Sequence, residues 1–475
     1  MFDEVIRKYR RYVALVDPRI EKYVNAEKEL RQALTLAPIS LTPAILYCIG
    51  VLDTDPALIA SLSALILVLS TFRVLETLTS ITSISRGLDD ELPFATLVAA
   101  AASKTGLEFV DFLRFASTSK VFKSFRFLGE RFVKLAEVLG VAGALTTLSK
   151  IASGKTKYFL TEYSLALNSG TALTQLRDAA SDYVKTIYAQ VVKSVNFRIN
   201  AGLTACVALT TGPLVSISMT FLVGDELVGF VVPALVLAGF LISSLFPDYP
   251  VSLQVVVDGG LLRVFRASYA AGTLLLLLPL HNLVSGDLRD FVKFLQITSV
   301  ISLVLGAFPA ILQLTALSTA VEGRVVSRAS NHVRVFRSFH LYDDEELRRA
   351  VRRRVRSWLT LYLSDALAFL KSLGDCEPEV FELFVSFFYE VRRTLKHYVS
   401  ALAVMCFTVV LTPFLIASTI SLGYEAAPLT STLLVSYVSV LVLGYSVSKI
   451  SLGKNTSTAY PALATLIFAT LLPVK

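Results

Sequence analysis

Residues 296–319 read QITSVISLVLGAFPAILQLTALST, a run of apolar and small polar side chains with no ionisable group. A run of this length is what a helix needs to cross the hydrocarbon core of a bilayer. It is followed by a strongly charged stretch, residues 321–397, and a second such stretch covers 77–197. Together with 54% hydrophobic residues and a mean hydropathy of +0.64, this alternation predicts a polytopic membrane protein with two sizeable domains outside the bilayer.

The expected fold is an all-α polytopic membrane protein with about nine transmembrane helices and two helical cytoplasmic domains. Every expected span is close to the length that a membrane helix needs. The spans are expected at 36–52, 56–75, 199–223, 227–246, 267–284, 296–319, 399–420, 428–448 and 456–474. The first is diluted by two prolines and by polar side chains, which leaves open whether it spans fully.

Six consecutive segments follow from this pattern. An amphipathic cytoplasmic segment opens the chain, and membrane blocks then alternate with the two helical domains. The boundaries are 1–35 for the N-terminal segment, 36–76 for spans one and two, 77–197 for the first cytoplasmic domain, 198–320 for spans three to six, 321–398 for the second cytoplasmic domain and 399–475 for spans seven to nine.

Charges in the short loops predict the orientation. Loops on one side carry mainly acidic residues, whereas those on the other carry Arg263 and Arg266, then Lys449 and Lys454. Lysine and arginine mark the cytoplasmic side. We therefore expect a multi-pass protein of the cytoplasmic membrane, with the N-terminus inside and the C-terminus outside. The same rule explains the net charge of +8 without a nucleic-acid partner.

No motif for catalysis, a cofactor or a metal emerges. The four cysteines and four histidines lack the close spacing of a metal or redox site. Gly154-Lys155-Thr156 resembles the end of a phosphate-binding loop, but Ser149 stands where that loop needs its first glycine, and the preceding residues predict a helix. The residues therefore predict no metal site, no nucleotide site and no cofactor.

The first charged stretch predicts a helical bundle. Asp89 to Glu91 precede Pro93, as at a helix N-terminus, and Gly106 is expected to end that helix. Four further helices are expected at 107–117, 121–151, 156–168 and 171–197, with Ser169-Gly170 as the break before the last.

Two short motifs in this bundle resemble a known family. The segments 88–94 (LDDELPF) and 159–173 (FLTEYSLALNSGTAL), with the helix end at Thr105-Gly106 between them, resemble the type II secretion system F-domain proteins. They are most similar to the archaeal branch, the platform proteins of archaeal type IV pili and of the archaellum. The motif residues that carry the resemblance are Glu91, Leu92, Pro93, Gly106, Ser169 and Gly170.

That resemblance implies a non-enzymatic scaffold at the base of a filament assembly machine. Its implied partners are a cytoplasmic hexameric secretion ATPase, whose motion it would couple to pilin or archaellin insertion, and the membrane lipids around it. A homodimer is plausible beneath a symmetric ATPase. The alternative is a polytopic permease or membrane enzyme with an unrecognised site, although the expected spans hold almost none of the ionisable groups that transporters need.

The second charged stretch offers a candidate docking face. Apolar residues at 347, 351, 355 and 358–359 recur at helical spacing, which predicts one amphipathic helix over 345–359. Its polar face would carry arginines, and Asp343 to Glu346 would lie at its N-terminus. A solvated surface, contact with anionic lipid headgroups and docking to an acidic partner such as the ATPase all remain open. The candidate docking residues are Arg348, Arg349, Arg352, Arg353 and Arg356.

Overall fold

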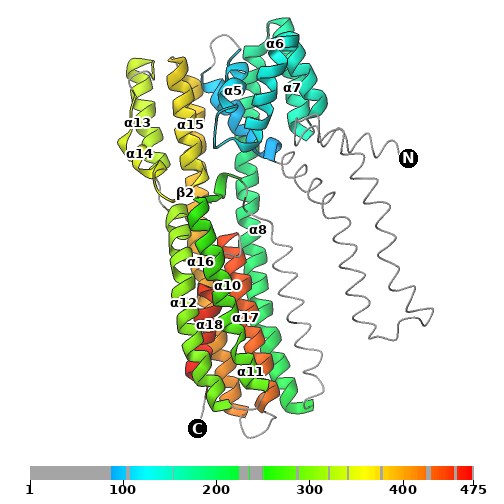
Figure 1. The fold of residues 1–475 in the computed structure, drawn as a ribbon, viewed down its shortest axis with the longest axis vertical. Coiled ribbons are helices and arrows are strands. Elements are labelled where there is room, and N and C mark those ends of the chain that lie inside the picture. Colours follow the sequence, from blue (N-terminus) through cyan, green and yellow to red (C-terminus); the bar gives the residue numbers. More distant parts are fainter. Residues whose placement is uncertain are drawn as a thin grey trace, which may run out of the picture. The chain divides into compact units, whose positions relative to one another are not determined.

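The computed structural model describes residues 87–102, 107–152, 154–223, 235, 249, 251–284, 288–318, 321–339, 342–374, 378–423, 429–453 and 457–472. The expected N-terminal segment, the spans at 36–52 and 56–75, and all of 227–246 except Leu235 lie outside these residues. The chain divides into two compact units, Met1–Ala180 and Ser181–Lys475. Helices dominate the described part of both, as the apolar and amphipathic patterns predict (Figure 1).

The first unit is the expected helical bundle. A helix over 87–101 is followed by α5 (Glu108–Ala116), α6 (Lys123–Ile151), α7 (Gly154–Ser169) and the start of α8 (Ala172–Val223). Helices lie over all four ranges expected after Gly106, although α8 continues beyond the expected end at 197. Aromatic rings fill the core, where Phe109 meets Phe159 at 4.7 Å and Tyr163 at 5.3 Å between ring centroids. Such edge-to-face pairs add to the stabilisation that burial alone provides.

Helix α6 is long and apolar enough for a membrane crossing, yet it is not one straight helix. Gly140 adopts φ 70° and ψ 174°, a conformation that interrupts the helix and that glycine tolerates best. The parts on either side, 123–139 and 141–151, are both shorter than the roughly 20 residues that a crossing requires.

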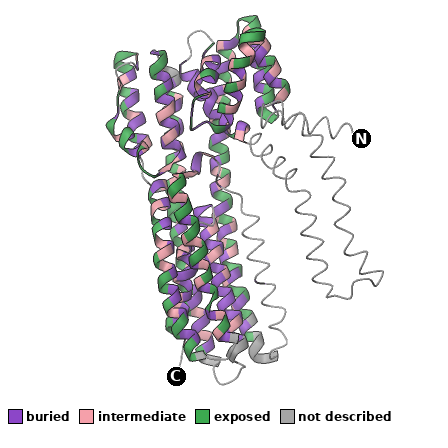
Figure 2. Cartoon of the chain, in the orientation of Figure 1, coloured by how far each residue is buried: buried purple, intermediate pink, exposed green. Residues whose placement is uncertain are grey.

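The second unit contains a bundle of long apolar helices. Its members are α10 (Gly259–Leu277), α11 (Pro279–Val284), α12 (Leu288–Ser318), α16 (Pro378–Gly423), α17 (Leu429–Leu452) and α18 (Ala459–Leu471), together with the later part of α8. The short helix α18 packs against α12, α16 and α17 (Figure 1). Figure 2 shows α12 and α16 with buried residues along one side and exposed residues along the other.

Five described helical stretches have the length and hydropathy of a membrane span. Besides α6 they are Gly259–Leu283, Arg289–Phe336, Phe381–Ser421 and Thr432–Leu452, and Ala459–Leu471 is a shorter apolar helix. The described part of the chain is therefore mostly helical, with helices suited to a membrane. A total of nine spans and the six-segment layout remain predictions.

Glycines allow these helices to approach closely. A Cβ added at Gly444 would collide with Pro461 of α18, and one at Gly306 would collide with the backbone of Thr458 and Ala459. Small residues at such crossings let helix backbones pack tightly inside a bilayer.

The second charged stretch also folds into helices, but not as one piece over 345–359. Helix α13 (Val321–Phe336) leads to α14 (Glu345–Val351), a turn, strand β2 (Val355–Ser357) and α15 (Trp358–Leu373). Strand β2 pairs antiparallel with β1 (Val255–Val257), which follows the short 3₁₀ turn η3 (Val251–Leu253). The single amphipathic helix was a wrong prediction because this ladder, invisible in the local pattern, offers 355–357 a hydrogen-bonding partner a hundred positions away in the chain.

Candidate functional site

Two carboxylates on the helix over 87–101 each cap a different helix of the first unit. The Glu91 carboxylate accepts backbone N–H groups from Ser124 (3.1 Å) and Phe125 (3.0 Å) at the start of α6. The first N–H groups of a helix have no partner inside it, so an acceptor there stabilises the helix end and complements its dipole. Glu91 thus joins two helices that lie 33 or 34 positions apart in sequence.

Asp89 makes the equivalent contact with α7. Its Oδ1 accepts the Thr156 backbone N–H at 2.9 Å and the Thr156 hydroxyl at 2.8 Å. Gly154, the first residue of α7, has φ 59°, and a Cβ there would collide with the Asp89 carboxylate. The Thr156 N–H and hydroxyl at the start of α7 therefore already have an internal carboxylate as their partner.

The acidic residues lie at the start of the described part of their helix, 87–101, and Pro93 lies inside it, as the sequence pattern predicts. Their carboxylates, however, serve the N-termini of other helices. The sequence pattern could not distinguish acids that cap their own helix from acids that cap its neighbours, because both place carboxylates near proline and a following apolar run.

Burial changes the acidity of Glu91. Desolvation raises its pKa from 4.5 to about 7, against the opposing effect of the N–H groups of Phe125 and Ser124 and of the positive charge of Lys123. Loss of water disfavours the charged form, while hydrogen bonds to it favour the charge. The cap is thus a group that changes charge near neutral pH.

The other motif residues that the structure describes lie in the core or at a helix end. Leu92 is buried, and Ser169 ends α7, where its hydroxyl lies 2.8 Å from that of Thr171. Gly170 has φ 77° and separates α7 from α8, as expected from the sequence. Gly106 falls outside the described residues.

The expected docking arginines are divided among three kinds of position. Arg348 and Arg349 lie on α14 and pair with neighbouring acids, Arg348 with Asp343 and Arg349 with Glu345 at 2.6 Å. Asp344 caps α14 by accepting the Leu347 N–H at 3.0 Å. The expected acidic N-terminus of this helix is confirmed, and it neutralises part of the arginine face.

Arg356 is tied into the fold. Its guanidinium contacts Asp258 at 3.2 Å and donates to the backbone carbonyls of Val351 and Arg353. Arg352, Arg353 and Arg354 instead occupy the exposed turn between α14 and β2, hereafter the arginine turn. Within the described part of the chain none of these three side chains forms an ion pair. Arg352 and Arg353 are therefore the part of the expected face that is open to a partner, and Arg354 lies beside them.

A buried arginine of the second unit was missed by the sequence reasoning. Arg198 of α8 has a fully buried side chain, although it stands one residue before an expected span. It donates to the Ile450 carbonyl at 3.0 Å, and its guanidinium lies 4.1 Å from the Tyr249 ring centroid. Because Ile450 lies in the last turn of α17, the cation meets the negative end of that helix dipole. Its position at a span edge was the only available signal, and snorkelling was the ordinary interpretation.

Two tyrosines complete this cluster. The Tyr249 hydroxyl lies 2.7 Å from the Ser451 carbonyl and 2.8 Å from the Tyr398 hydroxyl. Tyr398 donates to the Ile450 carbonyl at 2.8 Å. The cluster joins α8, α16 and α17 through the carbonyls that α17 cannot satisfy itself. These contacts hold the three helices together.

Within the described ranges, no three His, Cys, Asp or Glu side chains lie close enough to hold a metal ion. Cys206 is a buried free thiol and Cys406 a part-buried one, and both positions fit a packing role. What the sites can do is hold helices together and present positive charge.

The comparisons with known proteins leave the resemblance as an expectation: no protein-family model, no curated protein and no solved structure matches this chain.

Proposed function

We propose that this protein is a platform of the cytoplasmic membrane in an archaeal type IV pilus or archaellum assembly machine. In this role it links a cytoplasmic secretion ATPase to the insertion of pilin subunits. The observation that carries the proposal is the pair of carboxylate caps, because the residues of the motif that resembles the F-domain proteins, Asp89 and Glu91, are the ones that connect helices of the first unit. We expect a motif that connects helices in a domain that must transmit force as a rigid body.

Two continuous helices support the coupling. Helix α16 runs from Pro378 to Gly423, through the expected boundary between the second cytoplasmic domain and span seven. Helix α8 runs from Ala172 to Val223, through the corresponding boundary before span three. Proline interrupts the hydrogen bonding of each helix only farther along, at Pro213 of α8 and Pro413 of α16, so both helices pass the expected boundary as hydrogen-bonded backbone. The proposed motion thus passes from cytoplasmic helices to membrane helices without crossing a loop.

The test is affinity purification of the tagged full chain from native membranes. We expect a secretion ATPase and a prepilin or pilin to co-purify, whereas a tagged polytopic protein of unrelated function should retain neither. Purification with neither partner, after crosslinking in intact cells, contradicts the proposal and favours a permease or membrane enzyme.

The same experiment can examine the arginine turn as the contact of the ATPase. Arg352→Glu, Arg353→Glu and Arg354→Glu together reverse three exposed charges without touching the Arg356–Asp258 pair. We expect the ATPase to be lost and membrane insertion to be retained. Replacing the same three residues with lysine keeps the charge and should keep the partner. Unchanged ATPase recovery from the glutamate variant would exclude this turn as the contact.

A further inference from the structure

Two adjoining cavities in the second unit form a groove along α16. Each has a volume of about 380 Å³. The first lies among α12, α13, α15 and α16, and the second lies between α12 and α16, farther toward the C-terminus of α16, and reaches Tyr249 and Tyr460. Leu317, Leu395 and Val399 line both, so the cavities adjoin. We call them together the α12–α16 groove.

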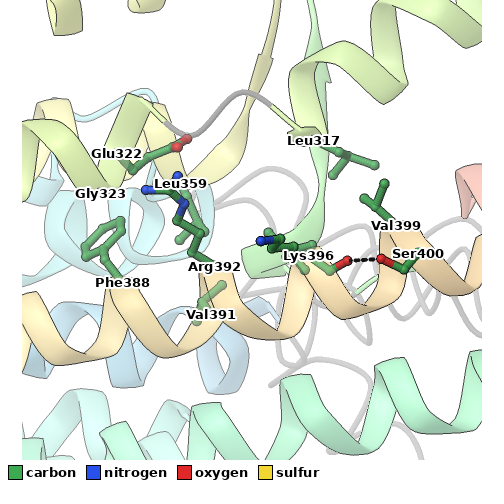
Figure 3. A pocket seen from close by; sticks show the side chains of 11 residues that line it. Leu317, Glu322, Gly323, Leu359, Phe388, Val391, Arg392, Lys396, Val399 and Ser400 are labelled. Carbon is green, nitrogen blue, oxygen red and sulfur yellow. Dashed lines mark hydrogen bonds between the residues drawn. The ribbon is translucent and has the colours of Figure 1, made fainter.

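One end of the α12–α16 groove is cationic. Arg392 and Lys396, one helical turn apart on α16, line the first cavity, and Figure 3 shows both side chains directed into it between Glu322 and Leu317. Both are exposed, and within the described part of the chain neither forms an ion pair. Arg392 lies close to α13 at Gly323, where a Cβ would lie 3.1 Å from Nη1 of the arginine.

The acid in this cavity already has other partners. Glu322 accepts the hydroxyls of Ser357 and Thr360, each at 2.5 Å. These bonds hold the carboxylate at the N-terminus of α15, where Ser357 is the N-cap. The cationic end of the groove is therefore suited to an anion that the protein itself does not supply.

The other end of the groove is apolar. Ile311 and Leu314 of α12 face Leu402 and Ala403 of α16 there. The outward surfaces of the same two helices expose large apolar side chains, including Phe308 at 53% and Phe407 at 61%. Such surfaces are typical of helices in contact with lipid chains. Along α16 the positive residues at 392 and 396 come before the expected span at 399–420, so the groove runs from the interface into the bilayer.

We propose that the α12–α16 groove binds one anionic phospholipid, with its phosphate between Arg392 and Lys396 and an acyl chain along the apolar end. Arginine and lysine near a cytoplasmic interface attract anionic headgroups, and a phosphate accepts charge-assisted hydrogen bonds from both. A soluble phosphate would use only the cationic end and would leave the apolar end unexplained. A phospholipid fits both ends, and it is present wherever a membrane helix is. This inference is independent of the role in filament assembly.

The experiment is native mass spectrometry of the full chain in detergent, titrated with dioleoylphosphatidylglycerol as the anionic probe. The wild type should bind it, and the double variant Arg392→Gln, Lys396→Gln should bind it about tenfold more weakly or worse. The double variant Arg353→Gln, Arg393→Gln removes the same charge outside the groove lining and should bind as the wild type does. Equal affinity of both double variants would overturn the proposal.

Two further arms identify the ligand. Ala403→Phe adds a ring at an exposed position of the apolar end and should weaken the probe while leaving the cationic end intact. Dioleoylphosphatidylcholine, which has no net charge, should bind weakly to every variant. Effective competition by glycerol phosphate would assign the groove to a soluble phosphate, and equal binding of the zwitterionic lipid would assign it to apolar contact alone; either result refutes the anionic phospholipid.

Discussion

The Glu91 carboxylate accepts the backbone N–H of Phe125 at 3.0 Å, which makes a side chain of one helix the N-terminal cap of another. An ordinary N-cap comes from the residue just before its helix. Here the cap arrives through tertiary contact, so α6 loses its cap if the two helices separate. The local stability of α6 and the assembly of the first unit are thereby coupled.

The raised pKa of Glu91 predicts that the folded protein loses stability as the pH rises. Because the folded-state pKa of Glu91 is about 7 and its ordinary value is 4.5, the folded protein binds more protons between these values than the unfolded chain does. The free energy of unfolding is therefore highest below about pH 4.5 and falls as the pH rises through 7. The shift corresponds to at most about 3 kcal/mol for this one group.

Chemical unfolding of the full chain in detergent, monitored between pH 5 and pH 8, measures this effect. Glu91→Gln keeps an acceptor near α6 but does not titrate, so its free energy of unfolding should change less with pH than that of the wild type. Glu130→Gln, an exposed carboxylate paired with Arg126 at 3.0 Å, is the matched control and should leave the slope unchanged. A Glu91→Gln slope equal to that of the wild type would show that Glu91 does not titrate in this range.

The cap that Asp89 provides for α7 should act separately from the cap that Glu91 provides for α6. Asp89→Ala removes the acceptor of the Thr156 N–H and hydroxyl and should destabilise the first unit by about 1 kcal/mol, as N-cap deletions usually do. Hydrogen exchange of the backbone amides over 154–158 reports the loss directly, because these amides should exchange faster while those at the start of α6 stay protected. Equal acceleration at both helix starts would mean that the caps do not act separately.

The sequence predicted most of the first unit because its helices are delimited locally. Gly170 at φ 77° and the change from apolar to polar pattern are properties of a few neighbouring residues. The function of Asp89 and Glu91 was not local, since their acceptor oxygens serve amides more than 30 positions away. The motif could be located from the sequence, but the helices that it joins could not.

In the second charged stretch, the local sequence pattern itself predicted the wrong secondary structure. The residues from 345 to 359 have a sound helical period, yet Val355 to Ser357 form a strand because Val255 to Val257 offer a partner. The division of the arginines follows from this ladder, which places Arg356 beside Asp258. The sequence reasoning missed Arg198 for a related reason. A single charge beside an apolar run gives the same sequence pattern whether its side chain snorkels to the membrane surface or is buried against a helix end.

Among the charged residues of the second unit, Arg198 should be the one whose replacement lowers the stability most. Arg198→Gln removes the hydrogen bond to Ile450 and the contact with the Tyr249 ring, and we expect a loss of about 1.5–3 kcal/mol because a charge-assisted hydrogen bond is lost in the interior. Thermal unfolding in detergent should show a lower Tm. Lys193→Gln, exposed on the same helix, is the control. Similar Tm values for the two variants would contradict a structural role for the buried cluster.

Gly444 should tolerate no side chain, because a Cβ there would collide with the backbone of Pro461 in α18. Gly444→Ala must separate α17 from α18, and we expect a cost of about 1–3 kcal/mol, as for other overpacked sites. Gly212→Ala is the matched control, since a Cβ there meets nothing within 4 Å and alanine favours a helix over glycine by up to about 1 kcal/mol. The two substitutions are chemically identical, so opposite shifts in Tm would isolate helix contact as the cause. A stabilising Gly444→Ala would mean that α17 and α18 do not meet at this crossing in the membrane.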